Sequence, residues 1–179
     1  MAEADRRRWD ARYREREPGL RQPSRSLVAL ADLMPQGGRA LDVAGGTGRH
    51  ALWLARRGLD VILADISGVA LELARREAAG AGLPLRTLAI DLEAEPLPPG
   101  PWGLILCVDF LWRPLFEAIP AAPARGGLLV VVHPTRSNLR RHSRPGPRHL
   151  RGDGELPGLA RGLEVLRELA GLQRQAGDP

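Results

Sequence analysis

Short apolar runs alternate with amphipathic stretches along most of the chain. Five of these runs contain few polar positions, which is typical of strands buried on both faces of a sheet. They lie at residues 39–43, 59–66, 85–90, 102–108 and 128–133. Between them, apolar residues recur with helical spacing at residues 5–17, 26–34, 50–57, 67–79 and 111–122. The alternation predicts an α/β fold, a three-layer sandwich whose parallel sheet lies between helices.

A polar residue stands at the end of every predicted strand. The five runs close with Asp42, Asp65, Asp91, Asp109 and His133. Because the carboxyl ends of parallel strands meet at one edge of the sheet, we expect these side chains to gather there. Ligands of open α/β sheets bind at this edge, so the pattern predicts a binding site formed by the strand ends.

The first strand leads into residues 40–50, Ala-Leu-Asp-Val-Ala-Gly-Gly-Thr-Gly-Arg-His. A strand, a glycine turn and a helix in this order allow the backbone to approach a nucleotide-like ligand closely. One interpretation is a dinucleotide site: residues 46–51 fit G-x-G-x-x-A, and Asp65 follows at the distance of an acid that binds ribose hydroxyls. This interpretation favours NAD and an oxidoreductase.

Two features favour a different ligand. Asp42 would place a negative charge beside a pyrophosphate, which is a repulsive arrangement. Asp91 and Leu92 after the third strand suit an adenine amino group, which a carboxylate and a backbone N–H can recognise together. A ligand with a ribose and a positive charge, but no phosphate, therefore fits this ring of acids better.

The composition excludes several function classes. The chain has 179 residues, a net charge of +5 and no lysine among its 26 basic residues. A Walker P-loop and Schiff-base chemistry both need a lysine, so neither is present. A genomic base composition that favours Arg over Lys is the main explanation of the arginine excess, and nucleic acid or an acidic substrate is the alternative. Few aromatic residues and no periodic basic helix count against nucleic acid.

The same features bear on location. The single cysteine, Cys107, excludes a disulfide framework within the chain, so we expect a cytoplasmic protein. No run of about 18 apolar residues is present, so no membrane span is expected. The N-terminus has no apolar segment of the kind found in secretory signals.

We expect a single domain over residues 1–179. Its parts are N-terminal helices at 1–34, a binding core at 37–133, an Arg- and Pro-rich loop at 134–154 and a tail at 155–179. The tail is expected to hold a short helix at 155–162, and a strand or more helix at 163–168. His142 and His149 in the loop have no companion ligands nearby in the sequence, so no metal site is expected.

At this point the sequence resembles a known group. Leu-Asp-Val-Ala-Gly-Gly-Thr-Gly at 41–48 is similar to motif I of the class I S-adenosylmethionine-dependent methyltransferases, and Asp65 and Asp91 match its next two motifs. Trp9-Asp10-x-Arg12-Tyr13 and the stretches at 37–42 and 48–58 resemble the methyltransferases related to tellurite-resistance proteins most closely. The resemblance covers roughly residues 9 to 135.

The resemblance implies a Rossmann-like sheet of strand order 3-2-1-4-5 followed by a short sixth strand, with the usual seventh strand missing. It implies S-adenosylmethionine as the cofactor. The residues that would contact it are Arg12, Tyr13, Asp42, Ala44, Gly45, Gly46, Gly48, Asp65, Ile66, Asp91, Leu92, Cys107 and Val108.

Each region of the cofactor has its counterparts in this set. Ala44, Gly46 and Gly48 would lie against the methionine part, and Asp42 near its ammonium group. Asp65 would bind the ribose hydroxyls, and the adenine would contact Ile66, Asp91 and Leu92. Cys107 and Val108 would line the floor of the pocket. Arg12 and Tyr13 of the N-terminal helix would close the pocket.

The sequence also departs from the family pattern. Position 44 is Ala where Gly is usual, and Asp-Phe-Leu-Trp at 109–112 replaces the Asn-Pro-Pro-Tyr type of motif, which counts against methylation of base amino groups. The catalytic residue is unknown; His133 and Asp109 are candidates for a base. The acceptor is expected to be a small molecule, which the arginines at 136–151 would attract if it is anionic.

Two further hypotheses remain open. The short C-terminal region favours a non-catalytic module, or one whose sheet edge is completed by a partner chain or by a second copy in a homodimer. The NAD-dependent oxidoreductase is the third choice.

Overall fold

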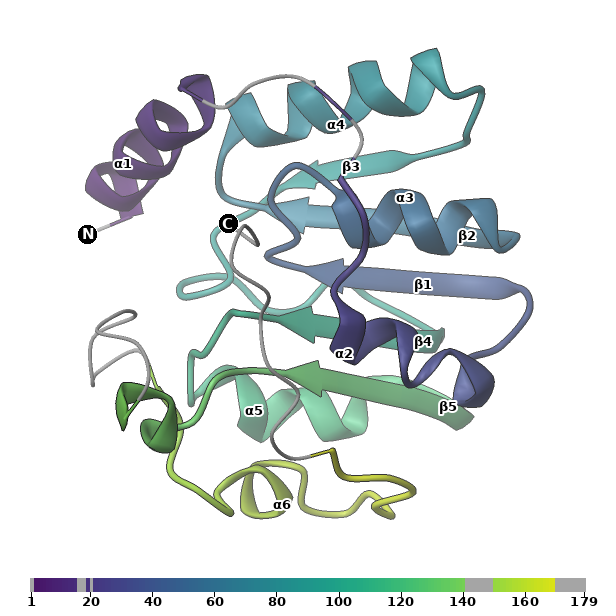
Figure 1. Cartoon of the computed structure of the whole chain (residues 1–179), viewed down its shortest axis with the longest axis vertical. Coiled ribbons are helices and arrows are strands. Elements are labelled where there is room, and N and C mark those ends of the chain that lie inside the picture. The colour runs from purple at the N-terminus through teal and green to yellow at the C-terminus, as the bar shows by residue number, and fades with distance from the viewer. Residues whose placement is uncertain (1, 16–18, 20, 141–149, 170–179) are drawn as a thin grey trace.

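A five-stranded parallel sheet forms the centre of the protein. In the computed structural model, residues 2–15, 19, 21–140 and 150–169 are described. The strands are β1 (Gly38–Val43), β2 (Leu59–Asp65), β3 (Arg86–Ala89), β4 (Trp102–Val108) and β5 (Pro123–Val132). Their order is β3-β2-β1-β4-β5, and every neighbouring pair is parallel (Figure 1). The predicted α/β class and strand order are confirmed.

Helices cover both faces of this sheet. The helices of the described chain are α1 (Ala2–Arg14), α2 (Arg25–Val28), α3 (Arg49–Arg56), α4 (Gly68–Gly80), α5 (Leu115–Ala118) and α6 (Leu156–Leu159), with 3-10 turns η1 (Ala31–Leu33), η2 (Ile119–Ala121) and η3 (Arg136–Arg140). Side chains of α2, α3 and α4 pack in one buried cluster, and those of α5 and η2 pack in another on the opposite face. The arrangement is the predicted three-layer sandwich.

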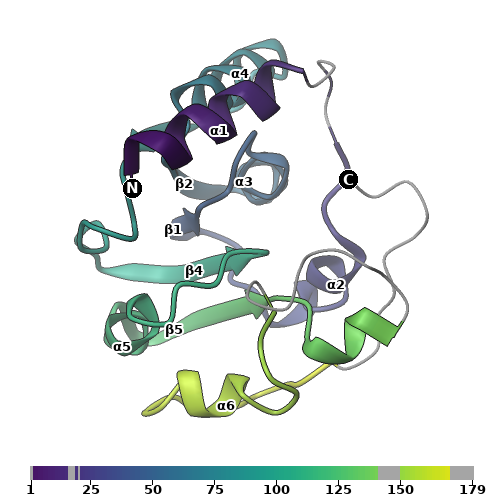
Figure 2. The same ribbon diagram turned by 90° about the vertical axis from the view of Figure 1, so that its left-hand side faces the viewer.

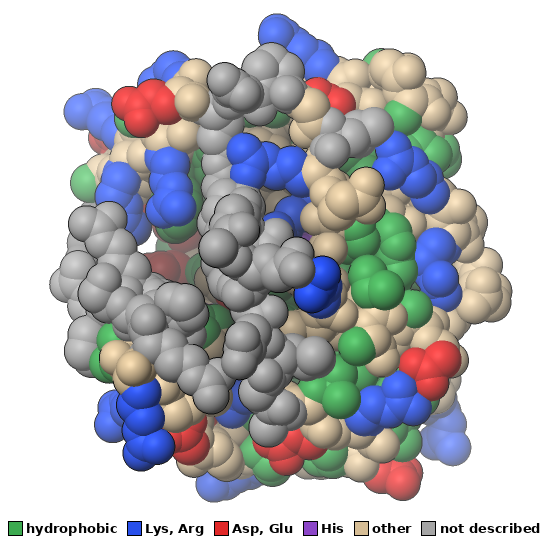
Figure 3. Space-filling view, in the orientation of Figure 1, with side chains coloured by type: hydrophobic (Ala, Val, Ile, Leu, Met, Phe, Trp, Pro, Cys, Tyr) green, Lys and Arg blue, Asp and Glu red, His purple; other side chains and the backbone are tan. Residues whose placement is uncertain are grey.

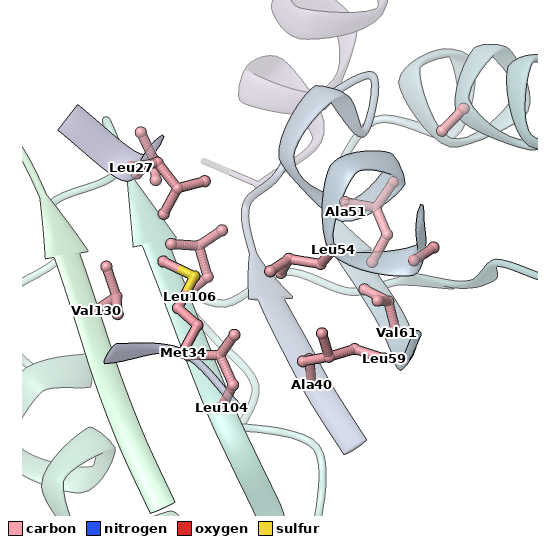
Figure 4. Close-up of a cluster of buried hydrophobic side chains, with 14 of the residues drawn as sticks. Leu27, Met34, Ala40, Ala51, Leu54, Leu59, Val61, Leu104, Leu106 and Val130 are labelled. Atoms are coloured by element: carbon pink, nitrogen blue, oxygen red, sulfur yellow. The ribbon is translucent and has the colours of Figure 1, made fainter. Parts of the chain in front are cut away.

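The larger cluster shows why the strands were recognisable as apolar runs. Leu54 of α3, Leu27 of α2 and Leu104 of β4 are fully buried in it, and Figure 4 shows them converging between the helices and the sheet. A strand that is covered on both faces has no polar position to expose, so its sequence reads as a continuous apolar run.

Local signals set the start of the two helices next to the strand ends. Gly48 adopts φ 77° before α3, a left-handed conformation that glycine reaches without a steric penalty. Ser67 caps α4, and its side chain accepts a hydrogen bond of 3.1 Å from the backbone N–H of Ala70.

The N-terminal helix lies outside the three layers. Figures 1 and 2 both place α1 beside α4, beyond the carboxyl ends of the strands. The Asp10 side chain accepts a hydrogen bond of 2.5 Å from the hydroxyl of Ser67 and one of 3.4 Å from the N–H of Val69. The helix is therefore anchored on the first turn of α4.

The expectation of a sixth strand at 163–168 is wrong. Residues 164–169 follow an irregular path, and the sheet has five strands in the part of the chain that is described. Arg167 pairs with Asp32 through two bonds of 2.7 and 2.9 Å, which lays this segment against the α2–η1 region. Val165 and Leu166 are consecutive and both more than half exposed, so the segment lacks the alternation of a half-buried strand.

Two prolines explain a second difference between the predicted and the observed elements. The helix expected at 111–122 is reduced to the four residues of α5, followed directly by η2. Pro114 stands at the N-cap of α5 and Pro120 lies within η2. A proline has no backbone N–H and clashes with the preceding turn, so a longer helix cannot pass through these positions.

Across the described residues, none of the helices is both long and apolar enough to cross a bilayer.

Candidate active site

The turn between β1 and α3 is packed tightly against the side chains of Asp42 and Leu63. A Cβ on Gly45 would come within 2.5 Å of Asp42 Oδ2 and would also collide with Leu63. The N–H of Gly45 donates to the carbonyl of Ala64 at 3.2 Å. Residue 44, the alanine at a position where glycine is usual, has φ 52° and so adopts a left-handed conformation that is strained for a side chain bearing a Cβ. The turn thus keeps the glycine geometry even at its one alanine.

Tyr13 of α1 lies against the same turn from the other side. A Cβ on Gly46 would be 2.6 Å from the Tyr13 hydroxyl oxygen. The ring of Tyr13 stacks on Trp9 with centroids 5.7 Å apart, and the Arg12 guanidinium lies over Trp9 at 5.1 Å. Tyr13 is buried while Arg12 is exposed, so the two residues predicted to close the site sit on different faces of α1.

Asp65 joins the end of β2 to the glycine turn. Its Oδ2 accepts a hydrogen bond of 2.7 Å from the N–H of Gly46, and its Oδ1 accepts one of 2.8 Å from the N–H of Ser67. The side chain is almost fully buried, and this burial raises its pKa although the backbone donors oppose the effect. Each carboxylate oxygen has a further lone pair that a ligand hydroxyl can use.

Asp42 is a buried acid beneath the glycine turn. It has no exposed surface, and neither carboxylate oxygen has a partner in hydrogen-bonding geometry among the described residues. Burial raises the pKa of Asp42 to about 7, and the charge of Asp65 adds to this. The Ala51 N–H dipole and the Arg49 charge lower it. An uncompensated acid under the turn favours a positively charged group above it and disfavours a phosphate.

Asp109, directly after β4, links this strand end to β5 and to the start of α3, next to the point where the strand order reverses. The Asp109 N–H donates to the Val132 carbonyl at 2.8 Å, and Asp109 Oδ2 lies 4.0 Å from Arg49 Nη2. Asp109 has φ 59°, a second left-handed conformation at a residue other than glycine. Strained residues of this kind gather at ligand sites, and ligands of doubly wound sheets bind at this reversal.

The other predicted residues surround this point. Leu92 and Cys107 are buried in the cluster on the α5 side, and Val108 is buried in the cluster on the opposite face of the sheet. Ile66 is half-buried after β2. Burial raises the pKa of the Cys107 thiol, whose Sγ contacts the Phe110 carbonyl oxygen at 3.4 Å. Asp91 accepts a hydrogen bond of 3.0 Å from the N–H of Glu93.

His133 follows β5 directly, at the same edge. Its Nδ1 lies 3.0 Å from the carbonyl oxygen of Pro134, and Arg151 Nε donates to the His133 carbonyl at 3.2 Å. Burial lowers the pKa of His133. His142 and His149 lie outside the described residues, and within the described part no group of three or more metal-ligating side chains occurs.

The structure therefore brings the strand-end residues to one edge, as predicted. It adds residues that the sequence did not single out for the site: Asp10, which anchors α1, and Arg49, which meets Asp109. Asp10 stands inside the Trp-Asp-x-Arg-Tyr stretch, so that motif held the signal, but its partner on α4 could not be inferred.

Comparison with known proteins agrees with this geometry. Residues 40–124 match the family profile described as "Methyltransferase domain". The demethylmenaquinone methyltransferase of Thermus thermophilus is 42% identical over 88 residues, a stretch that covers 48% of this chain and 39% of that protein.

Solved structures show the same fold at low sequence identity. A protein whose structure concerns conversion of a disulfide bond into a thioacetal group during echinomycin biosynthesis has a TM-score of 0.70 at 21% identity, covering 88% of this chain and 77% of its own. TehB from Haemophilus influenzae has a TM-score of 0.69 at 18% identity, and the match covers 81% of this chain and 52% of TehB. TehB is one structural neighbour among several, so the closer kinship expected with the tellurite-resistance type is not established.

The stretch that matches the family profile includes the glycine turn. S-adenosylmethionine is the methyl donor of such domains. Residues 40–124 of the chain are thus similar to the methyltransferase domain, and the sheet that contains them has the fold of class I S-adenosylmethionine-dependent methyltransferases.

Proposed function

We propose that the chain transfers a methyl group from S-adenosylmethionine to a small-molecule acceptor. The observation that carries the proposal is Asp42, a fully buried carboxylate without a hydrogen-bonding partner among the described residues, directly beneath the glycine turn. When bound, the cofactor supplies a methyl group that its sulfonium has already activated. The protein's task is then to hold and align the reactants, which can supply much of the rate.

The turn would hold the methionine part. Ala44, Gly46 and Gly48 all adopt positive φ, so the backbone can pass close to a ligand. Asp42 would stabilise the ammonium group through its charge from below the turn, because the side chain itself is covered by Gly45. The acid under the turn thus makes the site selective for a cation.

The adenosine part would lie along the ends of β2 and β3. Asp65 would accept hydrogen bonds from the ribose hydroxyls with the lone pairs that Gly46 and Ser67 leave unused. Ile66 would flank the adenine, and Asp91 with the N–H of Leu92 would bind its edge. Cys107 and Val108 would form the floor, and their burial supports an apolar one.

Helix α1 would cover the bound cofactor with Tyr13 and Arg12. The contact of Tyr13 with Gly46 supports this role, since α1 already reaches the turn. The Trp9–Tyr13 stretch also supports kinship with the tellurite-resistance type of methyltransferase, because it is one of the features that the sequence shares with that group beyond motif I.

We propose that the acceptor is an anion or becomes one when it loses a proton. The net charge is +5, and Arg113 and Arg151 lie close enough to His133 at the carboxyl edge to lower its pKa. Figure 3 shows arginine side chains dispersed over one face of the molecule instead of gathered in a stripe, which supports a small acceptor over nucleic acid. The relative from Thermus is named for methylating demethylmenaquinone, a molecule to include among the acceptors tested. We place the reaction in the cytoplasm.

Calorimetric titration of the Asp65→Ala variant tests the proposal. Loss of the carboxylate should weaken binding of S-adenosylmethionine at least tenfold, because ribose hydroxyls lose a charged acceptor worth about 1.5–3 kcal/mol. Asp60→Ala is the matched control: Asp60 lies on the same strand, but it is exposed and pairs with Arg86 on the surface. Equal affinity of both variants, with both folded by circular dichroism, would refute the role of Asp65.

Binding alone does not separate an enzyme from a binding module. Transfer of a labelled methyl group to any member of an acceptor panel establishes catalysis. Tight cofactor binding without transfer to any acceptor, together with a stable complex with another protein, would favour the non-catalytic hypothesis.

A further inference from the structure

We propose that His133 is the general base of the methyl transfer and that the acceptor offers a hydroxyl group. The inference rests on the proposed function, which it extends by naming the base and the chemical class of the acceptor. Four observations support it: the tautomer of the ring, its position, the charges around it, and the state of the other strand-end side chains.

The tautomer follows from one hydrogen bond. His133 Nδ1 lies 3.0 Å from the carbonyl oxygen of Pro134, and a carbonyl oxygen can only accept. Nδ1 therefore carries the proton, which leaves the lone pair of a neutral ring on Nε2. No described residue forms a hydrogen bond with Nε2. A ring oriented by its other nitrogen is how proteins prepare an imidazole base.

The position places the ring at the reaction edge. His133 follows the last residue of β5, and the N–H of Asp109 at the end of β4 donates to the Val132 carbonyl one residue earlier. Arg151 Nε binds the His133 carbonyl and holds its backbone. His133 thus lies next to the end of β4, at the carboxyl edge of the sheet where such folds bind ligands.

The charges around the ring keep it neutral. Burial has the largest effect and lowers the pKa of His133. Its bond to Pro134 and the charge of Asp109 raise the pKa, while the charges of Arg151 and Arg113 lower it. Arg113 is itself paired with Glu155 at 2.6 Å. Since the pKa lies below the usual value of about 6.5, the ring is an unprotonated base at pH 7.

The other described strand-end side chains are less suited to the task. Asp42 and Asp65 are buried below the turn, and Asp65 already binds two backbone N–H groups. Burial raises the pKa of the Cys107 thiol, so it stays protonated. Asp109 Oδ2 lies 4.0 Å from the guanidinium of Arg49, so this carboxylate is already engaged in an ion pair.

In the reaction, the acceptor oxygen forms a bond to the methyl carbon while the bond from that carbon to sulfur breaks. The electron pair of the broken bond goes to sulfur, which becomes neutral. The hydroxyl proton goes to His133 Nε2, so the products are a methyl ether, S-adenosylhomocysteine and an imidazolium that later loses its proton to water. A hydroxyl needs such a base because it is protonated at pH 7, whereas a thiophenol is not.

Nitrogen NMR of the ¹⁵N-labelled chain tests the base without any acceptor. The account predicts a His133 ring with its proton on Nδ1 at pH 7 and a titration midpoint below that of free imidazole side chains, about 6.5. The His133→Asn variant identifies the signal by its disappearance. A proton on Nε2, or a midpoint above 7, would overturn the proposal.

Methyl transfer tests the acceptor class, with labelled S-adenosylmethionine and four probes: phenol, catechol, benzylamine and thiophenol. Label is expected in the methyl ether of phenol or catechol. His133→Asn keeps a donor where Nδ1 stands, and His133→Gln places an amide near Nε2, yet neither is a base. Both should slow transfer about 10²–10⁴-fold at pH 7, with a rate that rises with pH.

The binding of S-adenosylmethionine should be unchanged within twofold in both variants. Label confined to benzylamine or thiophenol, no label in either hydroxyl probe, or full activity of the two variants would each overturn the inference. Failure of the unmodified chain to bind S-adenosylmethionine would overturn the proposed function itself, a result that calorimetry reports separately from the ring's tautomer.

Discussion

The backbone N–H of Gly46 donates to Asp65 Oδ2 at 2.7 Å, so the acid that ends β2 holds the turn that follows β1. This bond joins two segments that are 19 residues apart in the sequence. It fixes the glycine turn in the conformation that approaches a ligand, and it orients the carboxylate at the same time. Removing the acid would therefore affect both the ligand contact and the shape of the turn.

Asp42 lowers the free energy of unfolding as the pH rises, whereas a salt-bridged acid raises it. Its pKa rises from 3.8 to about 7 on folding, so the folded state holds a proton that the unfolded state has lost between these values. Stability contributed by this group is present below about pH 4 and is lost as the pH rises towards 7. Asp65 acts in the same direction, and His133 in the opposite one.

Asp42→Asn should therefore stabilise the protein at pH 8 and change little at pH 4. At 1.36 kcal/mol per pKa unit, the gain at pH 8 is at most about 4 kcal/mol. Urea unfolding at the two pH values measures it. A variant that is equally destabilised at both would show that the carboxylate has a partner at neutral pH.

Ala44→Gly should stabilise the chain. Ala44 has φ 52°, and a left-handed alanine is strained by about 1–2 kcal/mol, which outweighs the 0.5–1 kcal/mol of extra backbone entropy that glycine loses. Ala81→Gly is the control, because Ala81 is exposed and has an ordinary φ of −95°. Its unfolding free energy should fall while that of Ala44→Gly rises. A loss of stability in both variants would refute strain at position 44.

Asp10→Ala should release α1 from α4. The variant loses the bonds from Ser67 and Val69, so amide hydrogen exchange in α1 should accelerate about five- to thirtyfold, as expected for about 1–2 kcal/mol. Affinity for S-adenosylmethionine should also fall, because Tyr13 then leaves Gly46. Asp5→Ala, which removes only a surface pair with Arg8, serves as the comparison. Unchanged exchange in α1 after Asp10→Ala would show that Tyr13 and Trp9 hold the helix alone.

Leu54→Ala tests the packing beneath the site. Leu54 is fully buried in the cluster that Figure 4 shows, so truncation should cost about 2–5 kcal/mol of unfolding free energy. Val28→Ala in α2 removes apolar atoms from a side chain that is 47% exposed and should cost less than about 0.5 kcal/mol. Similar losses in both variants would contradict the position of the core.

Much of the fold could be predicted from the sequence, because its signals are local. The five strands are apolar runs, and Asp42, Asp65 and Asp109 mark the ends of three of them. The strand order came from a resemblance to a family, since no local pattern encodes which strands are neighbours. The short helix in the tail was also predicted, and α6 occupies part of that segment.

The parts that could not be predicted depend on tertiary contacts or on competing local signals. Nothing in the sequence indicates that Asp10 meets Ser67, since 57 residues separate them. The apolar residues at 163–168 suggested a strand or helix, but the Arg167–Asp32 pair draws this segment onto α2 and η1 instead. The sequence was sufficient to infer that the site residues share one edge of the sheet. The burial of Asp42 under Gly45 became evident only from the structure.

The most direct test of the central claim is a calorimetric titration of the unmodified chain with S-adenosylmethionine, S-adenosylhomocysteine and NADH. The account predicts micromolar-range binding of the first two and none of NADH, because the acids at 42 and 65 suit a cation with a ribose and repel a pyrophosphate. Binding of NADH without binding of S-adenosylmethionine would contradict it.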